Sequence, residues 1–231
     1  MHFMYLFLKR LFDFVCALAG FVVTLPLWPI VILGIELSDP GPVFYIARRT
    51  TKDNRVFNML KFRSMRQGKA NEAVFRGEED RIFPFGAFIR ATKLDELPQL
   101  INIMLGDMSI VGPRPASVEQ VQLTRGGRFA RTADVQSGLT GPSALYDYLY
   151  GDMVEVQEDY VRDVLPKRLE LDLVYLDKRS LGFDIKMIWW TAICIVSHIA
   201  GRRPERIFNT LLHWAEEHRE KEEAEQACLT N

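Results

Sequence analysis

Residues 14–35, FVCALAGFVVTLPLWPIVILGI, form a run of 22 residues without a charged side chain. As one straight helix the run would measure about 33 Å, enough to cross a bilayer core of about 30 Å. Pro26 and Pro29 remove backbone donors near its middle and free the carbonyl groups of Val22 and Leu25, which is costly in hydrocarbon. The run is therefore either a kinked membrane-spanning helix or a re-entrant hairpin that enters and leaves the membrane on one side.

Charges on both sides of this run favour the hairpin. Lys9 and Arg10 precede it, and the segment from Arg48 to Lys69 contains eight basic residues and one acid. Cytoplasmic segments attract Lys and Arg, and only a hairpin keeps both groups on that side. Thr24 is a candidate hydrogen-bond partner for a freed carbonyl. The basic segment suits phosphate groups or anionic lipid heads, or it is a solvated face.

The composition fits one sizeable core with an appendage in a reducing compartment. The chain has 231 residues, of which 48% are hydrophobic, and a formal net charge of −1. Its three cysteines, Cys16, Cys194 and Cys228, are far apart and form neither a CxxC pair nor a zinc motif. The four histidines form no metal-binding pattern either.

A short β-hairpin is expected after the apolar run. Residues 39–42, Asp-Pro-Gly-Pro, cannot continue a helix, and residues 43–48 and 56–65 are each typical of a strand. Within the second strand, Lys61 and Arg63 share one face because side chains alternate with a period of two. They could point together at one anion, or they could be two solvated cations.

The stretch TKLDELPQL, residues 92–100, contains two adjacent carboxylates whose role the stretch alone does not decide. Residues 85–92 predict a short helix that carries Arg90. Asp95 then resembles the N-cap of a helix over 96–105 that ends at Gly106, since aspartate is a favoured cap and glycine a favoured terminator. A helix N-terminus is also a natural anion site, so a cap and a chemical role are both open.

Arg114 and the C-terminal half offer further candidates. Arg114 lies between two prolines, which restrict the backbone and suit a preset phosphate-binding arginine. Residues 166–179 predict a helix with Asp172 on one face, whereas residues 117–163 give no clear assignment. Residues 187–199 are uncharged and too short to span a membrane, so they form either an interfacial helix or a buried one. The acidic tail after Trp214 is a solvated helix or disordered.

Four motifs follow one another in a specific order. They are DPGPVFYIARR (39–49), FNMLKFRSM (57–65), FGAFIRATKLDELPQLINIMLGDMSIVGPRP (85–115) and LDLVYLDKRSLGFDIKM (171–187). Together they resemble the bacterial sugar transferase family, the small monotopic phosphoglycosyl transferases, over about residues 8–195.

The resemblance implies an activity and a location. Such enzymes move a sugar 1-phosphate from a UDP-sugar to polyprenyl (undecaprenyl) phosphate and release UMP. They initiate surface glycans such as exopolysaccharide, O-antigen (lipopolysaccharide), capsule or glycoprotein glycans. They act on the cytoplasmic face of the bacterial inner membrane, held there by a re-entrant helix that breaks at a proline, here Pro26. Where members often have serine before that proline, this chain has Leu25.

The resemblance also implies the roles of individual residues. Asp95 would be the covalent nucleophile, and Glu96 with Asp95 would serve Mg²⁺. Carboxylates do act as nucleophiles in phosphoryl transfer, and cations are needed to neutralise the charge that meets at phosphorus. Two carboxylates of a glycosidase type fit less well, because neighbours on a helix diverge by about 100°. The remaining candidate phosphate- and substrate-binding residues are Lys61, Arg63, Arg90, Arg114 and Asp172.

The sequence and the resemblance predict an α+β chain that is mainly helical, with a re-entrant helix, a small β-hairpin and interfacial amphipathic helices. Residues 1–37 would be the anchor, 38–200 the catalytic domain and 201–231 a charged tail. The expected partners are a UDP-sugar, polyprenyl phosphate and membrane lipids, without nucleic acid and with a homodimer left open. The stretch PSALYDYLYG (142–151) departs from the family pattern, so the sugar is undecided.

Two other functions remain in competition. A catalytically silent scaffold for polysaccharide assembly would need the active residues to be lost, but Lys61, Asp95, Glu96 and Arg114 are all present. A direct glycosyltransferase would make a lipid with a single phosphate and release UDP instead of UMP. The nucleotide released therefore separates these enzymes.

Overall fold

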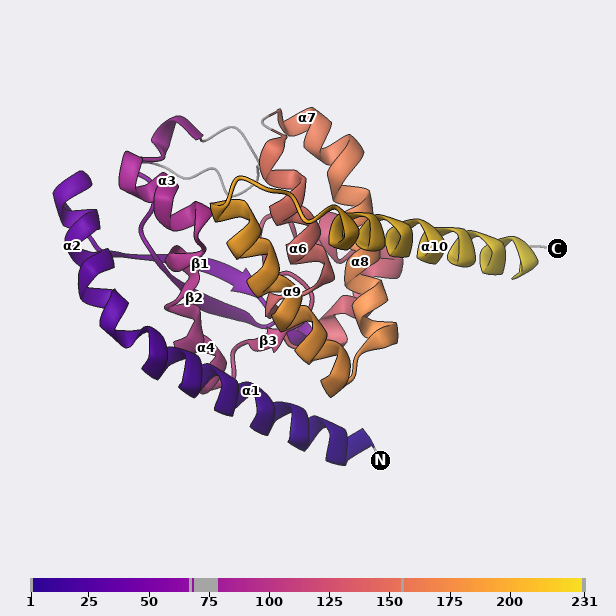
Figure 1. Ribbon diagram of the computed structural model, residues 1–231. Coiled ribbons are helices and arrows are strands. Elements are labelled where there is room, and N and C mark those ends of the chain that lie inside the picture. Colours follow the sequence, from indigo (N-terminus) through magenta and orange to yellow (C-terminus); the bar gives the residue numbers. More distant parts are fainter. Residues whose placement is uncertain (1, 67, 69–78, 155, 230–231) are drawn as a thin grey trace.

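The computed structural model describes residues 2–66, 68, 79–154 and 156–229, and it is mainly helical with two small sheets (Figure 1). This agrees with the predicted α+β class. The principal helices are α1 (His2–Thr24), α2 (Trp28–Ser38), α3 (Pro84–Ala91), α4 (Gln99–Leu105), α6 (Pro142–Leu149), α8 (Leu165–Lys178), α9 (Leu181–Ile199) and α10 (Glu205–Leu229). The strands are β1 (Phe44–Thr50), β2 (Val56–Phe62), β3 (Ser109–Val111), β4 (Ala116–Ser117) and β5 (Gly138–Thr140).

The apolar N-terminal run is a broken helix. A 3₁₀ turn, Leu25–Leu27, separates α1 from α2, and Figure 1 shows α2 turning away from the line of α1 at an open angle. The backbone amide of Trp28 donates to the carbonyl of Leu25, so one freed carbonyl is satisfied inside the turn. The hydroxyl of Thr24 donates to Gly20 O at 2.7 Å. Thr24 thus bonds one turn earlier than expected, because a threonine on a helix reaches back to the carbonyl four residues before it.

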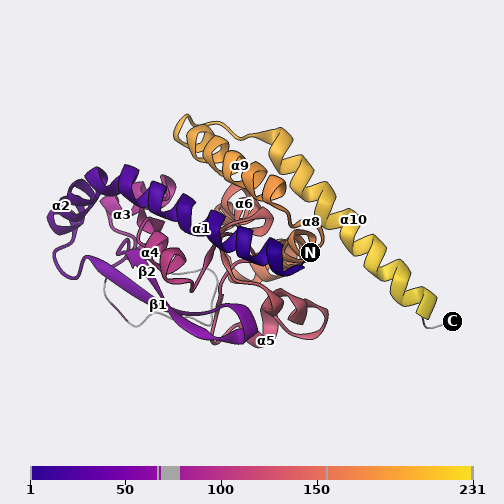
Figure 2. The ribbon, with the colours of Figure 1, turned by 90° about the horizontal axis from the view of Figure 1, so that it is seen from below.

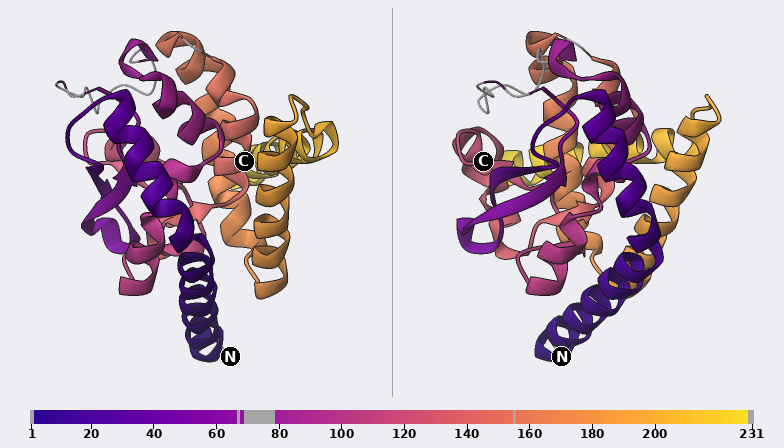
Figure 3. Two further views of the ribbon diagram at one scale, coloured as in Figure 1. Left: turned by 60° about the vertical axis from the view of Figure 1, so that its left-hand side comes forward. Right: turned by 90° about the vertical axis from the view of Figure 1, so that its left-hand side faces the viewer.

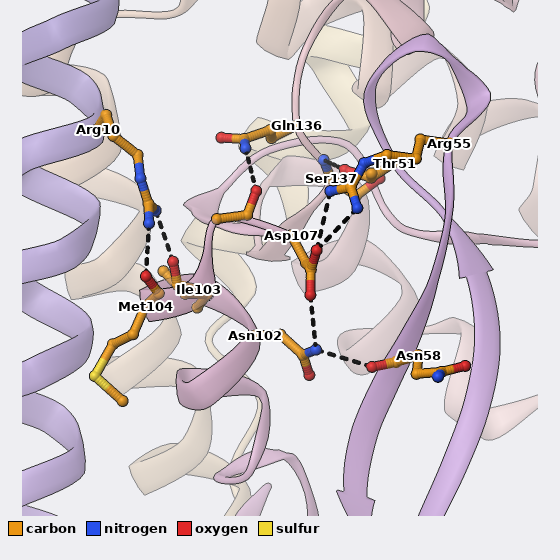
Figure 4. A network of polar contacts seen from close by, with 11 residues as sticks. Arg10, Thr51, Arg55, Asn58, Asn102, Ile103, Met104, Asp107, Gln136 and Ser137 are labelled. Carbon is orange, nitrogen blue, oxygen red and sulfur yellow. Dashed lines mark hydrogen bonds and ion pairs between the residues drawn. The ribbon is translucent and has the colours of Figure 1, made fainter.

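The broken helix is attached to the same globular body on both sides of its uncharged run. Before the run, Arg10 donates to the carbonyls of Ile103 (2.6 Å) and Met104 (2.7 Å), at the end of α4 (Figure 4). The buried Asp13 accepts from the hydroxyl of Ser109 at 2.8 Å. At the C-terminal end Asp39, directly after α2, pairs with Arg63.

The predicted hairpin is confirmed and carries a third strand. β1 and β2 are antiparallel, with Tyr45 opposite Lys61, and the short β4 pairs with the other edge of β1. The second strand ends at Phe62 instead of continuing to residue 65. Arg63 therefore leaves the pleat and does not continue the face of Lys61.

The segment that contains the two adjacent carboxylates differs from the predicted cap. Leu94–Glu96 is a 3₁₀ turn, and α4 begins only at Gln99, with Pro98 in the capping position and no side-chain cap bond. The interpretation of Asp95 as a helix N-cap is therefore wrong. Gly106 does end α4 in the left-handed conformation, at φ 92°, as expected.

Polar contacts join α4 to strand β2, and the residue just beyond α4 to the turn before β2. Asn102 accepts from the Leu60 amide (2.9 Å) and donates to the Asn58 carbonyl (2.8 Å), which joins α4 to β2. Asp107, just beyond α4, pairs with Arg55 at 3.0 Å (Figure 4). Buried polar groups need hydrogen-bond partners, so these bonds fix the position of α4. They thereby also fix the position of the 3₁₀ turn Leu94–Glu96 that precedes it.

The core lies between the helices and the parallel pair β3–β5. A large apolar cluster joins α1, β1, β2, α4, β3, α6, α8, α9 and α10, and a smaller one packs α2 onto α3 through Val31, Ile35 and Ile89. The predicted helices 85–92 and 166–179 match α3 and α8 within one residue at each end. The described part of the tail after Trp214 is helical, because it belongs to α10. This helix runs along α8 and then projects from the body (Figure 1).

Residues 117–163, which the sequence left unassigned, form short elements around the site. They include α5 (Val121–Thr124), a 3₁₀ segment Gly127–Asp134, β5, α6, a 3₁₀ turn Gly151–Met153, α7 (Gln157–Asp159) and a π-helical turn Tyr160–Val164.

One side of the molecule is apolar and exposed. Met4–Ser38 is long and apolar enough to cross a membrane, and only 11% of its most apolar window is buried. On α9 the exposed residues include Trp189 (66% exposed) and Val196 (66%), while Met187 and Cys194 face the core. The helix is therefore half-buried, with one face on the core and the other exposed. Figure 2 and the right panel of Figure 3 show α1 and α9 on the side away from the β1–β2 hairpin.

Candidate active site

A cavity of about 810 Å³ lies between the hairpin, α3, the 3₁₀ turn Leu94–Glu96 and α6. It collects residues from distant parts of the chain. Of the residues predicted from the sequence, the structure brings Lys61, Arg63, Arg90, Asp95, Glu96 and Arg114 together in its lining and leaves Asp172 outside it.

Asp95 is a buried carboxylate with one oxygen unpaired. The residue is 4% exposed, and its Oδ1 has no hydrogen-bond partner among the residues that the structure describes. Burial raises the pKa of Asp95 above its ordinary value, and the positive charge of Lys61 is the largest effect that opposes the shift. A carboxylate kept in a dry site without a full set of donors is poorly solvated, so it is reactive toward an electrophile.

Glu96 has a different environment from its neighbour. Its Oε1 accepts a hydrogen bond from Lys61 Nζ at 3.1 Å. Burial alone would raise its pKa, but Lys61, Lys93 and Arg114 outweigh this and lower the pKa of Glu96 to about 2. Glu96 is therefore ionised at any physiological pH, and the two adjacent carboxylates have opposite pKa shifts.

Lys93 is a residue of this site that the sequence did not single out. It precedes the 3₁₀ turn with φ 58°, in the left-handed region that only a few per cent of non-glycine residues adopt. Its ammonium lies 4.5 Å from the centre of the Tyr148 ring. A strained residue next to two carboxylates is typical of a functional site. The signal available in the sequence was its position, two residues before Asp95.

Arg114 is held in place by two buried acids. Its backbone amide donates to Asp172 Oδ1 at 3.1 Å, and its guanidinium lies 3.4 Å from Asp147 Oδ2. Asp172 also accepts from the hydroxyl of Ser143 at 2.5 Å. The structure therefore gives Asp172 the position of a residue that orients Arg114.

Asp147 lies on α6, within the stretch PSALYDYLYG (142–151). It accepts from the Tyr160 hydroxyl at 2.7 Å, and that hydroxyl accepts from Arg168 at 2.9 Å. Asp147, Tyr160 and Arg168 all line the cavity. Sequence reasoning missed these residues because their partners lie 8 to 33 positions away, and Asp147 and Tyr160 lie in a segment that it could not assign.

Arg63 lines the cavity, but its guanidinium serves another contact. It bonds to the side chain and the carbonyl of Asp39 and to the carbonyl of Pro42. Arg63 therefore links the end of the anchor to the hairpin, and the phosphate-binding role that was predicted for it stays a prediction. Arg90 faces the cavity from α3, and its charge lowers the pKa of Asp95.

The carboxylates of this site fit a magnesium ion that is bound jointly by the protein and by the phosphates of a substrate. No group of three or more His, Cys, Asp or Glu side chains with metal-ligand geometry exists among the described residues. Mg²⁺, however, commonly uses one or two carboxylates together with phosphates and water. The unpaired Oδ1 of Asp95 and the ionised Glu96 supply such a pair.

This arrangement suits chemistry on a phosphate ester. One carboxylate is buried and under-solvated, its neighbour is firmly ionised, and three or more cations surround both. Such an array stabilises charge that builds up on phosphate oxygens.

Comparison with known proteins gives consistent matches. A model of the family described as bacterial sugar transferase matches residues 4–198. The UDP-glucose:undecaprenyl-phosphate glucose-1-phosphate transferase of Xanthomonas campestris pv. campestris is 34% identical over 178 residues, 74% of this chain and 35% of that protein. The enzyme of the same name from Escherichia coli (strain K12) is 35% identical over 189 residues, which are 80% of this chain and 39% of that protein.

A relative with a different sugar in its name also matches. The UDP-N-acetylgalactosamine-undecaprenyl-phosphate N-acetylgalactosaminephosphotransferase of Aeromonas hydrophila is 31% identical over 209 residues, 86% of this chain and 46% of that protein. The chain thus spans less than half the length of each of these three relatives.

Proposed function

Because the chain belongs to the bacterial sugar transferase family, whose model covers residues 4–198, we propose that it is a phosphoglycosyl transferase. It transfers a sugar 1-phosphate from a UDP-sugar to undecaprenyl phosphate and releases UMP. The names of the relatives support the reaction class. The observation that carries the proposal is the buried, unpaired carboxylate of Asp95 within a ring of cations.

In the first step the carboxylate of Asp95 attacks the phosphorus that bears the sugar. The bond from that phosphorus to the oxygen of UMP breaks, and UMP leaves with the bonding electrons. Asp95 then carries the sugar phosphate as an acyl phosphate. Lys61, Arg90 and Arg114 line the cavity and offset the negative charge that an anionic nucleophile and an anionic substrate bring together.

Glu96 and Asp95 would hold Mg²⁺ in this reaction. When bound, the ion neutralises phosphate oxygens and lowers the cost of the approach of a carboxylate. Glu96 is suited to this role because its pKa of about 2 keeps it ionised. Lys61 holds Glu96 in position through the 3.1 Å hydrogen bond.

In the second step a phosphate oxygen of the lipid acceptor attacks the same phosphorus. The bond to Asp95 breaks, the carboxylate is regenerated, and the product is a sugar joined to the lipid through a diphosphate. The two steps use one nucleophile and one set of cations in turn. A direct glycosyltransferase would instead release UDP, and it would have no use for a buried carboxylate near phosphorus.

The same proposal includes attachment to the cytoplasmic face of the inner membrane of a bacterium and a role in starting a surface glycan. The support comes from the anchor, because Arg10 precedes its uncharged run, Asp39 follows it, and both bond to the catalytic body. A spanning segment would have its ends on opposite sides of the bilayer. A re-entrant helix, broken near Pro26, keeps both ends on one side.

The deciding experiment incubates the enzyme with a UDP-sugar and Mg²⁺ but without acceptor. The wild type should release about one UMP per active site and gain the mass of a sugar phosphate on the peptide that contains Asp95. Asp95→Asn should do neither. Asp53→Asn, a matched change in an exposed turn at φ 56°, should behave as wild type. Release of UDP, or turnover that requires both substrates without any adduct, would overturn the covalent mechanism.

A further inference from the structure

A second, smaller cavity adjoins the site, and its chemistry differs from that of the first. Its volume is about 310 Å³, at the lower end of the range for small-molecule pockets. It lies between α4, β5, α6 and α9. Most of its lining is apolar, including Leu97, Leu100, Ile110, Leu139, Ala144, Leu145, Ile188, Ala192 and Ile195.

The two cavities meet at the charged residues of the site. Lys93, Glu96 and Arg114 line both of them. The reacting centre is therefore reached from a large cavity with many charged groups and from a small cavity whose other residues are mostly apolar. At the charged end of the apolar cavity two cations, Lys93 and Arg114, face one carboxylate, Glu96, and this is the place where an anionic group on an apolar molecule would be stabilised.

The outer end of the apolar cavity lies on the side of the protein that exposes hydrophobic residues. Ala192 lines the cavity from α9 and is itself exposed. On the same helix Trp189 and Val196 are both 66% exposed, and Figure 3 shows α9 and α1 on a common side. A hydrocarbon chain could pass from this face into the cavity without crossing water.

We propose that the apolar cavity holds the isoprene units next to the phosphate of the lipid acceptor, with that phosphate at the junction of Lys93 and Arg114. This rests on the proposed function and assigns the acceptor its own subsite. A UDP-sugar is polar throughout, and its hydroxyls would be unpaired among Leu100, Ile188 and Ile195. The acyl end of a membrane phospholipid is neutral and would bring no anionic group to the end of the cavity where Lys93 and Arg114 lie.

The test compares two bulky substitutions on α9. Ala192→Phe fills the cavity, whereas Val196→Phe adds bulk on the exposed face outside both cavities. Ala192→Phe should raise the KM for undecaprenyl phosphate by about tenfold or more, since pocket contacts of this size are worth that much. UMP release without acceptor should remain at the wild-type level, because the UDP-sugar does not enter this cavity. Val196→Phe should leave both measurements unchanged.

Equal KM values for the acceptor in the two variants would overturn the inference. A wild type that releases no UMP would instead overturn the proposed function, so the two failures are distinguishable. Loss of UMP release in Ala192→Phe alone would mean that the cavity serves the donor substrate, which also contradicts the inference.

A second test uses the wild-type protein, so its result does not depend on whether a variant folds. A short isoprenyl phosphate with a photoactivatable group on its second isoprene unit should label peptides that contain Leu100 or residues 188–195. An excess of undecaprenyl phosphate should abolish the labelling. Labelling confined to the exposed face of α1 would overturn the inference.

Discussion

Asp95 combines a stability cost with the chemistry proposed for it. Ionised in a dry site with Oδ1 unpaired, it is poorly compensated, and this is the state that a nucleophile needs. Lys61 is the main compensating charge for both carboxylates. At the residue scale the site is therefore a balance between desolvation, which raises the pKa of Asp95, and cations, which lower it.

Replacement of Asp95 should stabilise the protein while it removes the activity. The folded state raises the pKa of Asp95, so the folded protein favours the protonated form and the ionised form lowers stability at neutral pH. We expect Asp95→Asn to be more stable than wild type at pH 7 by about 1 kcal/mol. The difference should shrink as the pH falls from the raised pKa toward the ordinary pKa of about 3.9, because Asp95 becomes neutral first in the folded state and then in the unfolded state.

Thermal unfolding of both proteins at pH 7 and pH 4.5 checks this expectation. A variant that is less stable than wild type at pH 7 would mean that the carboxylate makes a stabilising bond, as a helix cap would. Asp53→Asn is the control for the loss of a charge at the surface.

The rate of UMP release should fall at low pH, with a midpoint above the ordinary aspartate pKa of about 3.9. Asp95 must be ionised to attack, and burial raises its pKa, whereas Glu96 stays ionised with a pKa of about 2. Lys61→Gln removes the largest charge that opposes the shift, so the acidic midpoint should move to higher pH. Lys52→Gln, an exposed change in the hairpin turn, should leave it in place. A midpoint that does not respond to Lys61→Gln would assign the ionisation to another group.

At the scale of elements, α3 depends on one close backbone approach. A Cβ on Gly86 would lie 2.1 Å from the carbonyl oxygen of Ser64, so α3 can pack against the end of the hairpin only without a side chain there. This contact places Arg90 over the cavity. Gly182, near the start of α9, meets nothing within 4 Å.

Gly86→Ala should destabilise the protein by about 1–3 kcal/mol, because α3 must move away from Ser64. It should also slow UMP release, since Arg90 moves with the helix. Gly182→Ala should be neutral or stabilising by about 0.5–1 kcal/mol, as alanine is the better helix former. Chemical denaturation and the UMP assay measure the two effects. Equal stability of both variants would show that the close approach does not constrain α3.

At the scale of the whole molecule, the broken helix and the catalytic body form one unit. Arg10 bonds to the end of α4, and Asp39 bonds to Arg63 beyond β2. Both α1 and α9 carry exposed hydrophobic residues, and Figure 2 shows the two helices at the surface of the body.

Single cysteines at Met4 and Arg55 should therefore report the same side of the membrane. Both positions are exposed, and the native Cys16, Cys194 and Cys228 would first be replaced. A membrane-impermeant maleimide should label neither position in intact cells and both after the membrane is opened. Labelling of position 4 from outside would establish a spanning helix and contradict the re-entrant arrangement.

The sequence alone was sufficient for the features that depend on local rules. Proline chemistry predicted the break in the apolar run, turn residues between two strand-like runs predicted the hairpin, and Gly106 marked the end of α4. The order of the motifs led to the family, which the comparisons bear out. These features follow from steric and hydrogen-bonding preferences within a few residues, so no tertiary contact was needed to recognise them.

Only the tertiary structure decided how the polar groups are paired. It showed that Asp95 caps no helix and has an oxygen unpaired among the described residues, and that Asp172 bonds to the amide of Arg114. It also showed that Arg63 is bound to Asp39. The physical reason is that the state of a buried charge depends on which groups packing brings within a few ångströms of it. Those groups lie 24 to 58 residues away along the chain for Arg63 and Asp172, beyond the reach of any local pattern.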